Sequence, residues 1–341
     1  MVPPQPPTPV LPGRSTVTTA GEAHDQVNPA HVPLYTADQL PYGLESRVPM
    51  TVVSPWSKGG FVCSQVFDHT PVIRFIEARF GVHEPNITPW RRTVCGDLTT
   101  AFDFVRPDAA PPSLPDTAGY RAMADAQCRV PTPPTVPKTA GGILAQEPGT
   151  KPTRPLPYVL HVDGNDAGDG FTIRFRNRGT QGAHFYVYST SHAGGPWRYT
   201  VEAGKELAET WQPRDQGYRL AVYGPNGFFR QFGRRAADRT LTVETGYDGK
   251  AGDLLLTLAN PTRAAIDVTV EDGAYGHAER LYHLVPGQTL VDRWELEASK
   301  HWYDLTVALK GKPGWSQRVA GHVETGKTTD PAAVMPVLTG A

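Results

Sequence analysis

Hydrophobic and polar residues alternate along a series of short segments in the second half of the chain. Side chains of a β-strand point alternately to its two faces, so this alternation predicts antiparallel strands with one buried and one solvated face. Gly, Pro and Asn residues, which favour turns, separate the segments. The clearest predicted strands are 171–177, 184–189, 218–224, 253–260, 265–272 and 303–311.

The same part of the chain repeats itself after 83 positions. FTIRFRN is matched by LLLTLAN, and TVEAGKELAETW is matched by HLVPGQTLVDRW. The paired residues are Asn177 with Asn260, Gly204 with Gly287 and Trp211 with Trp294. Two copies of about 85 residues predict two tandem all-β antiparallel sandwich domains, at 158–247 and 248–337. The paired tryptophans are predicted to lie in the two sandwich cores.

The first part of the chain carries two helix start signals of the same kind. Thr70 followed by Pro71 predicts a helix in which apolar residues recur at every fourth position, and Gly81 predicts its end. Thr88 followed by Pro89 predicts a second helix. A third helix is predicted at 117–128.

A short apolar run precedes the first of these helices. Met50, Val52 and Val53 end at a Ser-Pro pair, which predicts a buried strand. A strand, a loop and a capped helix in succession are typical of an α/β domain.

Composition narrows the classes of function. The chain holds 34 Gly and 34 Pro residues, and the prolines gather at 1–40 and at 107–157, which are predicted to be an irregular segment and a linker or wrapping segment. The formal net charge of −1 provides no strong field for nucleic acid, so no nucleic-acid partner is expected. No run approaches the roughly 18 apolar residues of a spanning helix, so the chain is not predicted to be an integral membrane protein.

Three cysteines, Cys63, Cys95 and Cys128, fit neither a disulfide framework nor a zinc site. Two alternatives remain for them: buried free thiols, or one bridge between Cys63 and Cys95 if the chain is extracytoplasmic.

Residues 43–104 resemble the end of the catalytic domain of bacterial phosphocholine-specific phospholipases C. The resemblance is carried by RVP, SPWxxGG, FDHTxVIRFIE and IxPWRRxVCGDLT, and the two β repeats look like the paired C-terminal domains of these enzymes. They belong to a wider phosphoesterase family that also contains acid phosphatases. The resemblance therefore identifies 1–106 as the C-terminal part of an alkaline-phosphatase-like α/β domain, an α/β remnant placed before the two sandwiches.

The resemblance also implies the chemistry. The family uses a divalent metal held by carboxylates and an Asn, together with a nucleophilic hydroxyl, to hydrolyse phosphatidylcholine, and sphingomyelin as a further candidate, to phosphocholine. The sequence shows no counterpart of the family's Glu-Asn-His, Asp-Glu-Asn or nucleophile motifs, so we expect this chain alone to bind no metal and to be inactive. A separately encoded N-terminal catalytic part is a candidate partner. The family is secreted or periplasmic, although residues 1–15 do not form a signal peptide.

Five residues are candidates for a site in the intact enzyme. Asp68 and His69 combine a carboxylate and an imidazole at a helix start and are candidate catalytic residues. Trp90, Arg91 and Arg92 are candidates for contact with phosphate or choline. The alternative is that Asp68 caps the helix, that His69 packs, and that the two arginines pair with acids such as Asp97 or Asp103.

A second class of function stays open from the sequence alone. The paired β repeats are also compatible with a non-catalytic module that binds a lipid surface or a partner protein, because a sandwich fold does not determine a function.

Overall fold

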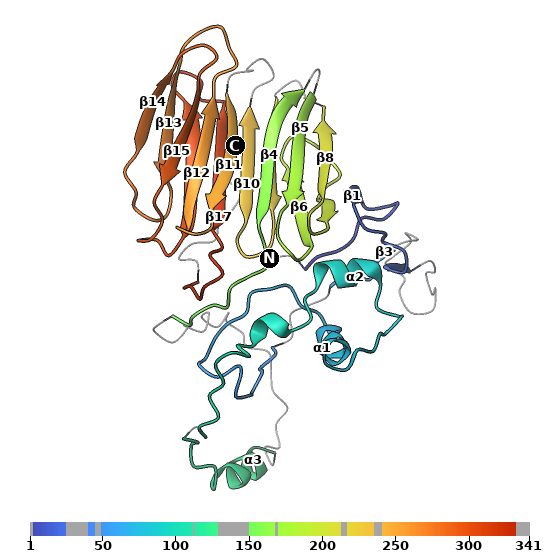
Figure 1. Ribbon diagram of the computed structural model, residues 1–341. Coiled ribbons are helices and arrows are strands. Elements are labelled where there is room, and N and C mark those ends of the chain that lie inside the picture. The colour runs from blue at the N-terminus through green and yellow to red at the C-terminus, as the bar shows by residue number, and fades with distance from the viewer. Residues whose placement is uncertain are drawn as a thin grey trace.

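The computed structural model describes residues 3–24, 40–44, 49–111, 113–128, 150–167, 170–212, 217–234 and 241–331. In Figure 1 the sheets form a layered β structure, and the helices lie beyond one end of its strands. The helices are α1 (Pro71–Phe80), α2 (Pro89–Val94), the 3₁₀ helix η1 (Thr99–Ala101) and α3 (Tyr120–Cys128). The strands of the N-terminal part are β1 (Gly13–Ser15), β2 (Ala23–His24) and β3 (Leu40–Pro41).

The other strands follow in two sets that correspond to the two sequence repeats. The first set is β4 (Leu160–Ala167), β5 (Gly170–Asn177), β6 (Ala183–Ser189), β7 (Trp197–Val201), β8 (Glu206–Trp211), β9 (Tyr218–Tyr223) and β10 (Phe229–Arg234). The second set is β11 (Thr242–Asp248), β12 (Asp253–Ala259), β13 (Ile266–Asp272), β14 (Arg280–Leu284), β15 (Thr289–Trp294), β16 (Trp302–Leu309) and β17 (Ser316–His322). The six strands predicted from alternation are confirmed as β5, β6, β9, β12, β13 and β16.

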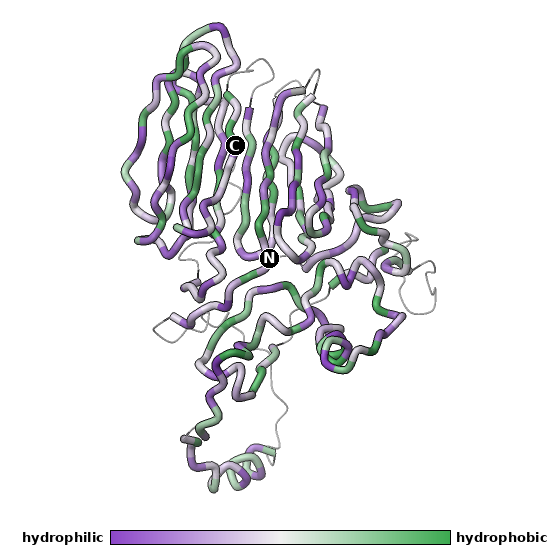
Figure 2. The backbone as a smooth tube through the Cα atoms, viewed as in Figure 1, coloured by the Kyte–Doolittle hydropathy of each residue, from purple (hydrophilic) through white to green (hydrophobic). Residues whose placement is uncertain are grey.

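The strands of the two repeats form, together with β1, one long sheet and two short ones that pack against it, while β2 and β3 form a separate two-stranded sheet. The long sheet has nine strands in the order β1-β7-β6-β9-β10-β17-β16-β13-β14, and the short sheets are β4-β5-β8 and β11-β12-β15. All of their pairings are antiparallel except that of β1 with β7. Figure 2 shows hydrophobic and hydrophilic residues alternating along these strands.

Each short sheet encloses a separate hydrophobic core with its half of the long sheet. Ile173 and Phe185 lie in the first core, and Leu256 and Leu305 lie in the second. Trp211 and Trp294 are buried in the first and second core respectively, as predicted from their equivalent places in the repeats.

A buried asparagine performs the same task in both repeats. Asn177 Nδ2 donates to the carbonyl oxygens four and 24 residues further along the chain, at 2.8 and 3.1 Å. Asn260 Nδ2 makes the two equivalent bonds at 2.9 Å. Gly204 and Gly287, with φ of 73° and 74°, turn the chain so that their amides donate to the carbonyls of these asparagines. The repeated sequence thus encodes the same set of hydrogen bonds between strand ends in both repeats.

The two halves join through equivalent strands. β10 of the first repeat pairs antiparallel with β17 of the second, from Phe229 opposite Ala320 to Gly233 opposite Ser316. Because each half contributes the same strand, the contact has the character of a two-fold, isologous interface. In the other layer, the hydroxyl of Tyr247 on β11 donates to the carbonyl oxygen of Leu160 on β4 at 2.8 Å.

Arg230 lies buried at this junction, and its guanidinium bonds to groups from both repeats. Its Nη1 donates to the carbonyl oxygen of Ala320 at 2.9 Å. Its Nη2 lies within 3.1 Å of the hydroxyls of Thr245, Tyr247 and Tyr303. A buried cation bonded in this way links the two layers across the junction.

The two capped helices form where their signals predict. Thr88 accepts from the Arg91 amide at 3.2 Å and so caps α2. Gly81 ends α1 in the left-handed conformation at φ 68°, but Thr70, the predicted cap at its start, makes no side-chain capping bond. In the Pro-rich segment that follows α2, every described side chain from 113 to 128 is exposed, including those of α3.

The strand predicted around Met50, Val52 and Val53 is wrong for this structure. Residues 49–56 are described and form no strand, and the side chain of Val53 is 91% exposed. An apolar run becomes a strand only when a neighbouring strand satisfies its backbone, and the described residues bring none to it.

Replacing Arg230 with Met should lower the free energy of unfolding by about 3 kcal/mol, because buried hydroxyls and a carbonyl lose their charged donor. The same exchange at the exposed Arg174 should cost less than about 0.5 kcal/mol. Urea unfolding followed by tryptophan fluorescence measures both values. Equal values for the two variants would contradict the proposed link across the junction.

Candidate functional site

Asp68 lies in the loop that leads into α1, with both carboxylate oxygens engaged. Its Oδ1 accepts from the amide and the hydroxyl of Thr70, at 2.8 and 2.7 Å. Its Oδ2 accepts from Arg91 Nη1 at 2.7 Å. Burial opposes ionisation, but the bonds from Thr70 and Arg91 outweigh it and hold the pKa of Asp68 below its ordinary value. Asp68 is therefore a carboxylate that orders the start of the helix.

Arg91 connects Asp68 to two further segments of the chain. Its Nε lies 2.9 Å from Glu22 Oε1, and its Nη2 donates to the carbonyl oxygen of Gly43 at 2.9 Å. Each of its three nitrogens is thus engaged with a different segment. Arg91 cross-links the N-terminal segment, the loop at 43 and the loop before α1, which is a structural arrangement rather than an open phosphate site.

Glu22 is a member of this network that the sequence analysis did not find. Its side chain is 1% exposed, and Thr88, the cap of α2, donates to it through its hydroxyl. Burial raises the pKa of Glu22, although Thr88 and Arg91 act in the opposite direction. No local pattern marks this glutamate, because its partners lie more than 60 positions further along the chain.

Arg92 makes a second, separate ion pair. Its Nη1 and Nη2 each donate to one carboxylate oxygen of Glu77 on α1, both at 2.8 Å, and Nη2 also donates to the carbonyl of Glu84 at 2.7 Å. The bonds from Arg92 lower the pKa of Glu77 to about 2. The expectation that Arg91 and Arg92 pair with acids is confirmed, but the partners are Asp68, Glu22 and Glu77 instead of Asp97 or Asp103.

Trp90 docks α2 on the long sheet. Its side chain is fully buried, and Nε1 donates to Thr200 Oγ1 on β7 at 2.9 Å. It packs with Val94 and Cys95 in a small hydrophobic cluster. In this arrangement the enclosed indole offers no face to a ligand. The predicted contact of Trp90 with choline stays a prediction.

His69 differs from the other candidates because its side chain is exposed. Within the described part of the chain it takes part in no recorded hydrogen bond or ion pair. The structure therefore brings Asp68, Arg91 and Trp90 into one buried framework and leaves His69 at its solvent edge. A catalytic role for Asp68 or His69 stays a prediction.

The described residues gather no group of three or more His, Cys, Asp or Glu side chains that could hold a metal ion. The buried carboxylate of Glu22 and the half-buried carboxylates of Asp68 and Glu77 are each held by an arginine. All three cysteines are free thiols. In the part of the chain that the structure describes, no helix is long and apolar enough to span a membrane.

Replacing Arg91 with Met should lower the free energy of unfolding by about 3 kcal/mol, because Glu22 and Asp68 would remain buried without their cation. Arg79, which is exposed near the end of α1, provides a matched control with an expected change below about 0.5 kcal/mol. Chemical denaturation measures both. A loss for Arg91→Met no larger than that of the control would rule out the cross-link.

The lowered pKa of Glu77 makes a pH-dependent contribution to stability. A carboxylate whose pKa falls on folding stabilises the protein above its unfolded pKa, and the stabilisation disappears as the pH falls through the folded value of about 2. Glu77→Gln should therefore lower the melting temperature at pH 7 and have a vanishing effect near pH 2. Melting followed by circular dichroism tests this, and an effect that persists at pH 2 would assign it to packing.

Comparison with known proteins shows which protein family the chain resembles. The model described as "Bacterial phospholipase C, C-terminal domain" matches residues 152–233 and again 241–322, and the model described as "Phosphoesterase family" matches 20–83. Asp68 and His69 lie inside the phosphoesterase match, and Trp90, Arg91 and Arg92 lie beyond its end.

Three curated relatives align over most of this chain. A non-hemolytic phospholipase C of Burkholderia pseudomallei is 48% identical over 94% of this chain and 46% of its own length. A non-hemolytic phospholipase C of Pseudomonas aeruginosa is 43% identical over 88% of this chain and 45% of its own. A hemolytic phospholipase C of the same species is 37% identical over 92% and 47%. The chain spans about half the length of these relatives. These matches show that the chain belongs to the bacterial phospholipase C family, as a member in which a phosphoesterase segment is followed by two copies of the C-terminal domain.

Proposed function

We propose that this chain is the C-terminal part of a phospholipase C that hydrolyses phosphatidylcholine, with sphingomyelin as a further candidate substrate, to phosphocholine. Residues 1–106 complete an α/β catalytic domain, 107–157 connect it, and 158–247 and 248–337 are tandem sandwich domains. The names of the relatives and the phosphoesterase match support this proposal. On the same resemblance, we propose an extracytoplasmic location.

The apolar face of α1 is the observation that carries the proposal. Val72, Ile73 and Ile76 are 44–49% exposed and Phe80 is 68% exposed, although a stripe with this spacing normally packs on a core. Figure 2 shows green segments in this helical region, away from the sheets. The stripe lies inside the phosphoesterase match. Its proposed partner is the remaining part of the phosphoesterase domain.

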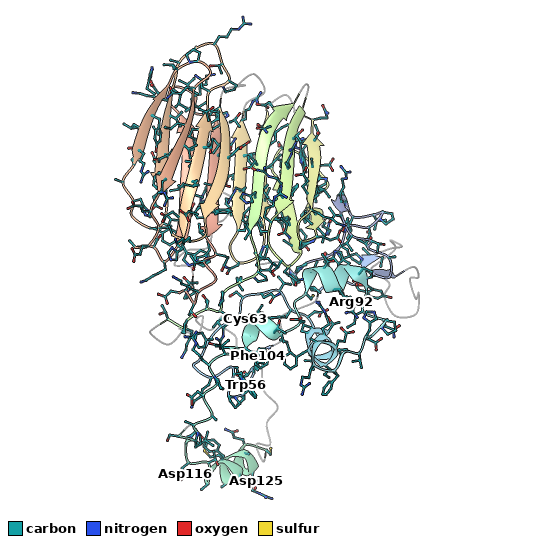
Figure 3. All side chains as sticks on the ribbon, in the orientation of Figure 1. Trp56, Cys63, Arg92, Phe104, Asp116 and Asp125 are labelled. Atoms are coloured by element: carbon teal, nitrogen blue, oxygen red, sulfur yellow. The ribbon has the colours of Figure 1, made fainter. Side chains whose placement is uncertain are left out.

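Two further features support the same partner. Trp56 and Phe104, labelled in Figure 3, are 41% and 53% exposed, and their ring centroids lie 6.3 Å apart in the same helical region. The apolar run at 49–56 lacks a partner strand among the described residues. Both are surfaces that a neighbouring sheet of an α/β domain would cover.

Catalysis by the assembled enzyme requires groups beyond those described here. The family's divalent metal would neutralise charge on the phosphoryl oxygens, but the carboxylates of Glu22, Asp68 and Glu77 are paired with arginines and do not form a ligand set. The rest of the domain would supply the metal ligands and the nucleophile, whether it is separately encoded or part of a longer chain. Within this chain, we assign substrate contact to His69 and a positioning role to Asp68, Trp90, Arg91 and Arg92.

Hydrolysis of p-nitrophenylphosphorylcholine tests the proposal. The 341-residue chain alone should show no turnover. The chain fused to the portion of the Burkholderia relative that it does not span should hydrolyse the substrate in an EDTA-sensitive manner. In that fusion, His69→Ala should lower kcat/KM at least about 100-fold, whereas His283→Ala, an exposed residue of the second sandwich, should leave it unchanged.

Three outcomes count against the proposal. Turnover by the chain alone would show that it carries a complete site. An inactive but folded fusion would remove the assignment to phospholipase activity. A fusion that binds phosphatidylcholine vesicles without hydrolysing them would favour the non-catalytic module.

A further inference from the structure

The exposed apolar side chains of the two repeats gather at one end of the second sandwich. Among the described residues of the repeats, the large hydrophobic side chains that are exposed are Leu281, Val285 and Val291, at 71%, 50% and 59%. They lie on β14, in the turn after it and on β15. β14 ends the long sheet, and Figure 1 shows it on the opposite side of the sheets from β1. Single scattered apolar residues are normal at a surface, but a group of them marks an interaction site.

The equivalent end of the first sandwich is covered by the N-terminal segment. The three exposed positions have equivalents 83 residues earlier in the chain, namely Arg198, Glu202 and Ala208. The amide of Arg198 donates to the carbonyl oxygen of Pro12 at 3.0 Å, and the amide of Glu202 donates to Thr16 Oγ1 at 2.9 Å. The guanidinium of Arg14, on β1, donates to the carbonyl oxygen of Ala208 at 2.9 Å. Each exposed apolar residue of the second repeat therefore stands where the first repeat bonds to a covering strand.

The backbone of β14 is oriented like that of β7. Leu281 lies opposite Thr269 on β13, as Arg198 lies opposite Tyr186 on β6, and both pairs are 83 positions apart between the repeats. Because the Arg198 amide points away from β6, the Leu281 amide points away from β13.

The carbonyl of His283 points outward in the same way. Its equivalent in the first repeat is Thr200, whose carbonyl oxygen accepts from the amide of Thr16 at 3.0 Å. The amide of Val285 differs, because Gln288 Oε1 accepts from it at 3.0 Å within the second repeat. The outward groups of β14 that have no recorded partner in the described part of the chain are thus those of Leu281 and His283.

The side chains at the two ends are the reverse of what protection of a free edge requires. Soluble proteins commonly place charged side chains on a free edge strand, because charge opposes pairing with another chain. Here Arg198 and Glu202 stand at the covered end, whereas Leu281 and Val285 stand at the exposed end. This distribution indicates that the exposed end of the second sandwich is itself covered by a further strand.

The charges beside this edge are compatible with a second copy of the same edge. Arg280 Nη1 lies 2.6 Å from Asp292 Oδ2, and His283 Nδ1 lies 2.7 Å from Asp267 Oδ1. Each basic side chain of β14 therefore has an acidic partner in its own chain. Two such edges can approach each other without bringing unpaired like charges together.

We propose that β14 strands of two copies pair antiparallel across a two-fold axis, which joins their long sheets in a homodimer. The chain already uses this mode internally, because the equivalent strands β10 and β17 pair antiparallel where the repeats join. The pairing covers Leu281 and satisfies the outward backbone groups of Leu281 and His283. Since β1 covers the opposite end of the long sheet, the pairing ends at two copies. The inference concerns assembly and does not depend on phospholipase activity.

Sedimentation velocity of the 341-residue chain tests the proposal. The chain should show a reversible monomer–dimer equilibrium with a micromolar dissociation constant, because pairing through one strand edge gives a small interface. Leu281→Lys should raise this constant at least about 10-fold, because it removes an apolar contact and brings two like charges together. Since Leu281 is 71% exposed, the same exchange should leave the melting temperature unchanged.

Phe80→Lys is the matched control, because Phe80 is 68% exposed and lies on α1, outside the proposed contact. It should leave the dissociation constant unchanged. Hydrogen exchange gives a second measure, since the amides of 281–283 should be more protected above the dissociation constant than below it.

Three results would each overturn the proposal. The first is a chain that stays monomeric at about 100 μM. The second is an effect of Phe80→Lys on association as large as that of Leu281→Lys, which would assign the contact to α1. The third is protection of the amides of 281–283 in the monomer, which would assign the covering strand to the same chain.

Discussion

A buried hydrogen bond from Trp90 Nε1 to Thr200 Oγ1 joins α2 to the long sheet, and Gln181 Nε2 adds bonds to carbonyl oxygens at the end of the same helix. An indole N–H taken out of water requires an acceptor, and Thr200 on β7 provides it. The position of α2 follows from this contact. Arg91, the next residue, is thereby placed where its guanidinium reaches both Glu22 and Asp68. The same threonine also lies 3.0 Å from Nδ1 of His184, a buried residue of β6.

The junction of the two repeats obeys a comparable constraint. Two sandwiches with free edge strands would expose unpaired backbone groups at β10 and β17, and the antiparallel pairing of these strands satisfies both edges at once. At the far edge of the first repeat, β1 pairs with β7 in parallel. The equivalent strand of the second repeat, β14, is the other end of the long sheet in the described residues. The N-terminal segment therefore distinguishes two otherwise similar repeats.

The helical region differs from the sheets in how completely its apolar side chains are buried. The repeats enclose complete cores, whereas α1 presents an apolar stripe to solvent beside well-satisfied ion pairs. Polar groups here find partners over short distances, but the apolar area needs a further layer of structure. This difference supports the proposal that 1–106 is one part of a larger α/β domain, whereas each repeat encloses its own core.

Local sequence determined the elements whose causes are local. Pro71 and Gly81 predicted the bounds of α1, and Thr88-Pro89 predicted the start of α2, because helix-end signals act within one turn, although Thr70 makes no side-chain capping bond. Alternation predicted the strands, and the 83-residue repeat predicted the equivalent Trp and Asn positions. The sequence also contained enough of the family motifs to identify the phospholipase C resemblance.

Only the tertiary structure decided which distant groups meet. Arg91 was visible as a candidate for phosphate, but its partner Glu22 lies in an irregular segment with no pattern around it. The apolar run at 49–56 satisfied every local criterion for a strand and failed for lack of a neighbour. The bond between His184 and Thr200 joins residues 16 positions apart, and the pairing of β10 with β17 joins residues 83 to 91 positions apart. Such contacts form only when the whole chain folds, and a local sequence pattern does not predict them.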